Sequence, residues 1–352
     1  MMQRASVVEE SSDSEADFRT TIVILSWNGC KLIPPCLDAV CWQSYADFSV
    51  ILVDNGSTDG SVAYVREHFP NVHVIALPEN RGFAGGNNVG IRAARGEYIA
   101  LLNNDAQPEP QWLEALVHAL EAHPEVGFCA SKMLRADDPR VIDTAGDLFY
   151  DYGVGGKRGM DQLDGPEFSR TEYVFGACAG AAIYRRAMLE DIGLFDEDFF
   201  LYGEDIDLSF RAQLRGYKCL FVPQARVHHQ VAATAGWGSH LSVYYSLRNM
   251  LYVLVKDMPA SLLLRHLGPI LFYFLAGDMI FTVAGYAGAV ARARRDNLKM
   301  LRKMMAKRRA IQAARCMPEA YIESILTKGQ LGVRVRSVLA QMRDNFGVPR
   351  PI

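Results

Sequence analysis

The chain has 352 residues, half of them hydrophobic and 22% charged, a composition ordinary for a globular protein. This length allows one large domain or two small ones with a buried core. The formal net charge of -3 argues against nucleic acid as a partner, because a phosphate backbone attracts chains with an excess of Lys and Arg.

The N-terminal residues 1–19 are rich in Ser, Asp and Glu and lack a basic stretch followed by an apolar run. This pattern predicts a disordered acidic tail rather than a signal peptide. The seven cysteines are scattered and form no C-x-x-C pair, which favours buried thiols in a reducing compartment over disulfides or a zinc site. We therefore expect a cytoplasmic protein.

Strand and helix patterns alternate between residues 20 and 125. Short β-branched or apolar runs predict strands at 21–26, 49–54, 71–77 and 97–103. Apolar residues at helical spacing predict helices within 27–43, 60–69, 84–95 and 108–123. This alternation predicts an α/β fold whose mostly parallel sheet is covered by helices on both faces. Ligands of such sheets bind beyond the carboxyl ends of the strands.

The regular alternation ends near residue 126. Glycine-rich segments and short strands follow, and then a predicted helix at 204–217 and a strand at 218–223. The residues QVAATAGWGSH (230–240) have the composition of an exposed loop.

Polar motifs follow the first two predicted strands. Asp54, in DNGSTDG (54–60), can cap the next helix through an Asx turn, or it can accept a hydrogen bond from a nucleotide base or ribose. Trp27, in SWN (26–28), offers an indole face on which a base can stack.

The motif NNDA (103–106) follows the fourth predicted strand. Asp105 can cap the next helix, or its carboxylate can bind a divalent ion held against a diphosphate. One carboxylate is too few for a metal site, so the diphosphate and either His228 or His229 would supply further ligands. An imidazole beside oxygen ligands favours Mn²⁺ over Ca²⁺.

The glycine-rich segment NRGFAGGNNVG (80–90) fits neither the dinucleotide-binding motif nor a P-loop. Its glycines would let the backbone approach a ligand closely, and Arg81 is a candidate contact for phosphate or ribose.

The segment YGEDIDLSF (202–210) places Glu204, Asp205 and Asp207 at the start of a predicted helix. A helix N-terminus stabilises each acid by about 0.3–1 kcal/mol, which explains one carboxylate better than three. The aromatic residues that precede them would exclude water, an environment that suits a general base. Glu204 and Asp207 remain partly explained as helix N-terminal acids.

In their order, these motifs resemble glycosyltransferase family 2, the inverting enzymes of the GT-A fold, and especially its rhamnosyltransferase-like bacterial branch. The resemblance covers roughly residues 20–250 and lies in ILSWNG, VDNGSTDG, NRGFAGGNNVGIRAARGEYIALLNNDA, FLYGEDIDLSFRAQLRGY and ARVHHQVAATAG. It implies a GT-A, Rossmann-like domain at 20–240, with a nucleotide-binding half (20–125) and an acceptor or catalytic half (126–240).

The resemblance also implies roles for single residues. Asp205 matches the catalytic base, and Asp105 and His229 match the ligands of Mn²⁺ or Mg²⁺. Asn103 stands where the family has the first acid of its D-x-D-like metal motif, which leaves Asp105 as the one carboxylate ligand. The residues implied to bind the nucleotide-sugar are Ser26, Trp27, Asp54, Arg81, Asn104, Asp105 and Glu204.

The implied reaction is transfer of a hexosyl or rhamnosyl group, with inversion, from a UDP- or dTDP-sugar to a glycan or polyprenyl-linked acceptor in cell-envelope polysaccharide synthesis. One alternative is a non-catalytic scaffold that binds nucleotide-sugar or glycan, which Asn103 favours. Another is a nucleotidyltransferase, which WNGCKLIPP disfavours because a glycine-rich basic loop normally follows the first strand of that class.

The C-terminal region, 241–352, is helical in pattern and unlike the rest. Residues 268–290 could span a bilayer by length, but they contain Asp278, and an intramembrane carboxylate costs about 2.5–3.5 kcal/mol. Ten Lys and Arg with a single acid fill 291–315. We expect helices that lie on anionic lipid at the inner face of the cell membrane. The alternative is a basic, solvated helix that closes the domain.

Overall fold

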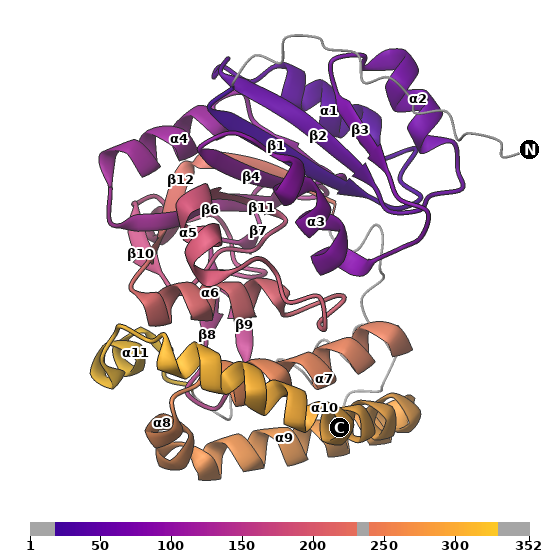
Figure 1. Ribbon diagram of the computed structural model, residues 1–352. Coiled ribbons are helices and arrows are strands. Elements are labelled where there is room, and N and C mark those ends of the chain that lie inside the picture. The colour runs from indigo at the N-terminus through magenta and orange to yellow at the C-terminus, as the bar shows by residue number, and fades with distance from the viewer. Residues whose placement is uncertain (1–17, 231–238, 330–352) are drawn as a thin grey trace, which may run out of the picture.

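The computed structural model describes residues 18–230 and 239–329 and contains a ten-stranded sheet with helices on both faces, followed by a layer of C-terminal helices (Figure 1). The predicted acidic tail, apart from its last two residues, lies outside the described residues. So do residues 231–238, which form most of the expected exposed loop, and residues 330–352.

The main path of the sheet runs β10-β12-β6-β11-β4-β1-β2-β3, with β5 paired to β12 and β7 to β6. These strands are β1 (Thr20–Ser26), β2 (Phe48–Asp54), β3 (His73–Ala76), β4 (Tyr98–Asn103), β5 (Ala106–Pro108), β6 (Val126–Arg135), β7 (Ile142–Thr144), β10 (Glu172–Val174), β11 (Ala181–Arg185) and β12 (Lys218–His229). A separate two-stranded ribbon consists of β8 (Asp147–Phe149) and β9 (Gly155–Lys157).

The predicted parallel sheet is confirmed for β3, β2, β1 and β4, whose pairings are all parallel. Strand β11 runs antiparallel to both β4 and β6. Strand β12 is longer than the predicted 218–223, because after a register shift at Val222 it continues to His229 and pairs with both β6 and β5. His229 is therefore a strand residue and not a loop residue.

Helices cover the two faces of the sheet with separate apolar cores. Helices α1, α2 and α4 pack on one face, and α3, α5 and α6 pack on the other. Their bounds are α1 (Ile33–Cys41), α2 (Ser61–His68), α3 (Gly82–Ala93), α4 (Trp112–Ala122), α5 (Arg186–Ile192) and α6 (Glu204–Arg215), with a 3₁₀ turn η1 (Pro166–Phe168) between β9 and β10.

The C-terminal helices lie on the side of α6 that faces away from the sheet (Figure 1). A third apolar core joins them to α6 and β8 through residues such as Phe210, Tyr252 and Met304. The elements are α7 (His240–Asp257), α8 (Ala260–Arg265), α9 (Leu267–Phe281), a π turn η2 (Thr282–Tyr286), α10 (Ala287–Ala313) and α11 (Glu319–Ile325).

Within the described residues, one continuous helical stretch, Leu267–Ala313, is long and apolar enough to cross a membrane by length and composition. Only 6% of its most apolar window is buried, so it is not a core helix of the domain. The stretch bends at Gly285, whose φ of 94° interrupts the helical backbone between α9 and α10.

Close packing of α3 on the sheet requires glycine at position 90. A Cβ atom there would lie 2.3 Å from Val23 Cγ1 and 3.0 Å from Val53 Cγ2. We predict that Gly90→Ala lowers the melting temperature, because overpacking costs about 1–3 kcal/mol and outweighs a helix-propensity gain of about 1 kcal/mol. Gly277→Ala in α9 is the matched control, since no atom lies within 4 Å of its Cβ position. Equal melting temperatures for the two variants would contradict the packing argument.

Candidate active site

Polar residues that end or follow neighbouring strands meet at one edge of the sheet. Ser26 and Asp54 are register partners at the ends of β1 and β2. The side-chain amide of Asn104, just after β4, donates a hydrogen bond to Ser26 Oγ at 2.9 Å. All three side chains are buried, so they form a polar cluster at the strand ends and not a solvated fringe.

One carboxylate oxygen of Asp54 accepts a hydrogen bond within the turn, and the other is available to a ligand. Its Oδ2 accepts a hydrogen bond from the Ser57 backbone N–H at 3.0 Å, as an Asx turn requires. Its Oδ1 is buried and has no hydrogen-bond partner in the described part of the chain. A buried acceptor without a partner costs about 1–3 kcal/mol, so Oδ1 suits a donor on a ligand. Trp27 directly follows Ser26 of this cluster in the sequence, and 42% of its surface is exposed.

The backbone of Arg81, immediately before α3, is fixed by a hydrogen bond, whereas its side chain forms an exposed ion pair. Its N–H donates to Asn55 Oδ1 at 2.8 Å, while its guanidinium pairs with Glu197 at 3.3 Å. Both charged side chains are about 40% exposed, and exposed pairs of this kind contribute about 0–1 kcal/mol. A phosphate group could therefore replace Glu197 as the partner of Arg81 at little cost.

His229 lies between two buried carboxylates. Its Nε2 is 3.2 Å from Asp105 Oδ1, and its Nδ1 is 2.9 Å from Asp143 Oδ2. Burial opposes protonation of the imidazole, but the two acids outweigh burial and raise the pKa of His229 to about 9. His228 points elsewhere, since its Nε2 contacts Glu109 at 3.1 Å. The structure thus brings together the two residues that the sequence suggested as metal ligands.

The donor set at Asp105 fits a divalent ion in part. Asp105 Oδ1 is buried without an aligned hydrogen-bond donor among residues 18–230 and 239–329, and it faces an imidazole nitrogen. No group of three or more His, Cys, Asp and Glu in those residues has the geometry of a metal site. Asp105 and His229 can therefore supply two ligands, and the others must come from a bound diphosphate or from water.

The three acids of α6 lie in three different environments. Asp207 is fully buried and pairs with Lys256 and Arg211, so it belongs to the packing of the C-terminal helices rather than to a solvated helix N-terminus. Glu204 is buried with one oxygen lacking a partner in the described residues, and burial followed by the charge of Asp205 raises its pKa. Asp205 is partly exposed, and its Oδ1 accepts the Ile206 backbone N–H at 2.8 Å.

Two charged residues near Asp205 were missed in the sequence. Asp147 on β8 is 3% exposed, and burial and the charge of Asp205 raise its pKa well above the usual range. Lys157 on β9 pairs with Asp143 at 2.8 Å. Burial raises the pKa of Asp205, whereas the Ile206 N–H and the Lys157 ammonium oppose that rise. In the sequence, the one indication of these residues was the pair of acids Asp143 and Asp147 within the otherwise apolar stretch VIDTAGDLF.

A comparison with known protein families identifies the region that contains this site. The sequence profile described as Glycosyl transferase family 2 matches residues 21–193, which include the polar cluster at the ends of β1, β2 and β4. Residues 21–193 therefore belong to glycosyltransferase family 2.

Relatives and solved structures agree with the family and the fold. The chain is 29% identical to the N-acetylglucosaminyl-diphospho-decaprenol L-rhamnosyltransferase of Mycobacterium tuberculosis, over 56% of this chain and 72% of that protein. It is also 29% identical to the O-antigen biosynthesis protein RfbC of Myxococcus xanthus, over 61% of this chain but 18% of that protein. The crystal structure of GalNAc-T7 with UDP, GalNAc and Mn²⁺ superimposes with a TM-score of 0.58 at 16% identity, over 70% of this chain and 49% of that chain. The predicted GT-A fold is thereby confirmed.

We predict that Lys157→Met moves the acidic limb of the pH–activity profile of this glycosyltransferase to higher pH. Removal of the ammonium leaves the effect of burial on Asp205 less opposed, so the pKa of Asp205 rises. If Asp205 must be ionised to act, a higher pH is then needed for the same activity. The measurement is kcat/KM from pH 5 to 9, with Lys299→Met, an exposed lysine on α10, as the control. An unshifted acidic limb would show that Lys157 does not affect the pKa of Asp205.

Proposed function

We propose that this family 2 glycosyltransferase moves a sugar from a nucleoside-diphosphate donor to a hydroxyl of a glycan or lipid-linked glycan, with inversion, in cell-surface polysaccharide synthesis. The observation that carries the proposal is the set of buried, unpartnered carboxylate oxygens of Asp54 and Asp105 at the strand ends, together with a desolvated, partly exposed carboxylate at Asp205. Ligands of such sheets bind at the strand ends, and a carboxylate of this kind removes a proton.

Asp205 is the proposed general base. Its carboxylate takes the proton of an acceptor hydroxyl, and the hydroxyl oxygen forms a bond to the anomeric carbon. The bond from that carbon to the diphosphate oxygen breaks on the opposite face, and the electron pair leaves with the nucleoside diphosphate. One displacement inverts the anomeric centre. The Ile206 N–H and Lys157 favour the ionised form of Asp205 before the reaction.

The strand-end residues bind the donor in this proposal. Asp54 Oδ1 accepts a hydrogen bond from the base, and Trp27 stacks on it. Arg81 exchanges Glu197 for the diphosphate. The hydrogen-bonded pair Ser26 and Asn104 lies beside the ribose, and Glu204 lies beside the sugar.

Asp105 and His229 would hold Mn²⁺ or Mg²⁺ next to the diphosphate. The ion would act as a Lewis acid that neutralises charge on the leaving group. Asp143 accepts a hydrogen bond from Nδ1 of His229 and so keeps Nε2 directed at Asp105. The crystal structure of GalNAc-T7 contains Mn²⁺, which supports a divalent ion in this fold.

The acceptor and the donor sugar are proposed from the relatives. The mycobacterial relative is named for rhamnosyl transfer to a decaprenyl-linked sugar, which supports a polyprenyl-linked acceptor here. A UDP- or dTDP-sugar is the donor that the family resemblance implies.

The C-terminal helices carry an exposed surface that suits a membrane. We define the lipid-facing surface as the exposed apolar residues of α8, α9 and η2 together with the exposed arginines of α10. The apolar members are Leu264, Leu267, Leu271, Phe272, Leu275, Met279 and Val283, and the arginines are Arg292, Arg295, Arg302 and Arg309. Asp278 is paired with Arg294 at 2.6 Å, which lowers the penalty of placing this carboxylate near lipid. We propose that this surface lies on the inner face of the cell membrane.

Asp205→Asn tests the proposed chemistry. We expect kcat to fall by about 10²- to 10⁴-fold, because a general base acts in the transition state, while donor affinity changes little. Turnover is measured with acceptor, and donor affinity is measured by thermal shift with UDP-, dTDP- and GDP-sugars plus Mn²⁺. Asp191→Asn, an exposed acid of α5, is the control. Equal losses of affinity and turnover would assign Asp205 a structural role. Donor binding by the unmodified protein without any transfer would favour the scaffold alternative.

Vesicle sedimentation tests the lipid-facing surface. We expect the full chain to bind vesicles that contain anionic phosphatidylglycerol and to be released by high salt, because each surface cation contributes about 1 kcal/mol. Arg302→Glu combined with Arg309→Glu should weaken binding at least tenfold, whereas Arg140→Glu, an exposed residue of the catalytic domain, should not. A chain that stays in the supernatant at low salt would contradict the proposed contact of this surface with lipid. A chain that resists alkaline extraction from the vesicles would indicate a membrane-spanning helix.

A further inference from the structure

The loop of residues 194–203, between α5 and α6, leads directly into Glu204 and Asp205. We call it the catalytic loop. Its backbone is strained, since Phe200 and Tyr202 have φ values of 64° and 67°. A non-glycine residue in this region costs about 1–2 kcal/mol. Such a conformation persists only when surrounding contacts impose it, so the contacts of the loop decide where Asp205 lies.

Helix α7 holds the backbone of the catalytic loop. The Asn249 side-chain amide donates to the carbonyl oxygens of Phe199, Leu201 and Tyr202 at 3.0, 2.8 and 2.7 Å. Arg248 donates to the carbonyl oxygens of Asp198 and Phe199, each at 2.8 Å. These bonds satisfy carbonyls that the irregular backbone cannot pair with itself.

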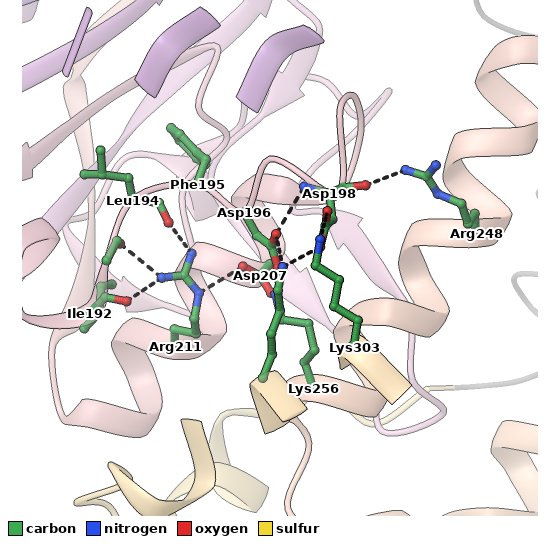
Figure 2. Close-up of polar contacts among 12 residues, drawn as sticks. Ile192, Leu194, Phe195, Asp196, Asp198, Asp207, Arg211, Arg248, Lys256 and Lys303 are labelled. Atoms are coloured by element: carbon green, nitrogen blue, oxygen red, sulfur yellow. Dashed lines mark hydrogen bonds and ion pairs between the residues drawn. The ribbon is translucent and has the colours of Figure 1, made fainter. Parts of the chain in front are cut away.

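Lysines of α7 and α10 hold the acidic side chains of the same loop (Figure 2). Lys256 pairs with Asp196 of the loop and with Asp207 of α6. Lys303 pairs with Asp198 at 2.7 Å. Lys307 pairs with both Asp196 and Asp198. The two α10 lysines are 54% and 30% exposed, whereas Lys256 is buried, so the α10 contacts can be altered without opening the core.

The opposite side of the catalytic loop reaches the donor half of the site. Glu197 lies between Asp196 and Asp198, yet it pairs with Arg81 and accepts a hydrogen bond from Asn88 at 3.0 Å. The Phe200 carbonyl accepts the Phe83 N–H, at the start of α3, at 2.6 Å. One short loop therefore contacts the α10 lysines and the candidate phosphate ligand Arg81, and it leads directly into the helix that carries the candidate base.

We propose that Lys307, assisted by Lys303, is a positioning residue for sugar transfer, because it fixes the catalytic loop between the C-terminal helices and the donor site. This inference rests on the proposed function of Asp205 and Arg81. It makes α10 part of the transfer machinery, in addition to its proposed contact with lipid. Neither lysine touches the reacting groups, so both act through the loop alone.

Lys307→Met tests the proposal. We expect kcat to fall about tenfold or more, because a displacement near 1 Å of a catalytic group can cost up to 10²-fold, with a change below threefold in the donor KM. Lys307→Arg should restore at least half of the turnover, because Arg can reach the same carboxylates. Lys303→Met, which removes one ion pair, should give a smaller loss. Lys299→Met removes an exposed charge from the same helix and should leave kcat unchanged.

Hydrogen exchange gives a second readout that does not depend on activity. In Lys307→Met, amides in residues 196–205 and, through Glu197 and Phe200, in residues 80–88 should exchange at least tenfold faster than in Lys299→Met. Unchanged exchange in both segments would overturn the proposal even if no transfer were detected. An active wild type with equal kcat in Lys307→Met and Lys299→Met would also overturn it and leave the proposed function intact. An inactive wild type with accelerated exchange would instead contradict the proposed function alone.

Discussion

A cluster of opposite charges, formed by Lys256, Asp196 and Asp207, lies almost out of contact with water. The joining of the catalytic domain to the C-terminal helices depends on the mutual neutralisation of these three charges. Removal of one partner from such a buried cluster leaves an uncompensated charge and costs about 3–5 kcal/mol. Arg211 extends the cluster, because it pairs with Asp207 and also donates to carbonyls of residues 192–194. Helix α6, α7 and the catalytic loop are therefore difficult to separate without exposing charge to an apolar interior.

This charge pairing explains why the three acids in the first turn of α6 can have different roles. Asp207 has two cations and stays ionised as a structural anion, with its pKa below the usual range although burial opposes this. Glu204 has no cation of its own, so burial and Asp205 raise its pKa. Asp205 lies between these cases, because Lys157 and a backbone N–H partly offset its burial. A carboxylate that is ionised but weakly solvated is the kind of group that accepts a proton from a hydroxyl.

Much of the catalytic domain was predictable from local pattern. Apolar runs of strand length alternate with helical spacing, so the parallel sheet and its ligand-binding edge followed from the sequence. The positions of Ser26, Asp54 and Asp105 at strand ends followed in the same way. Asp143, Asp147 and Lys157 did not, because they come from short irregular strands, and their approach to His229 or Asp205 joins segments that are distant in sequence. Glu197 was missed for the same reason, since its contact with Arg81 spans more than a hundred residues.

The strand–helix alternation, the turn chemistry at the strand ends and the family resemblance followed from the amino-acid order, because each depends on residues close together along the chain. The tertiary structure was needed to show that Asp143 holds His229 against Asp105 and that Asp207 is a packing anion rather than a solvated helix acid. It also decided that the basic helix α10 holds the catalytic loop with one side while it exposes cations on the other. Those outcomes depend on desolvation and charge pairing between distant segments, and burial of that kind exists only after the chain has folded.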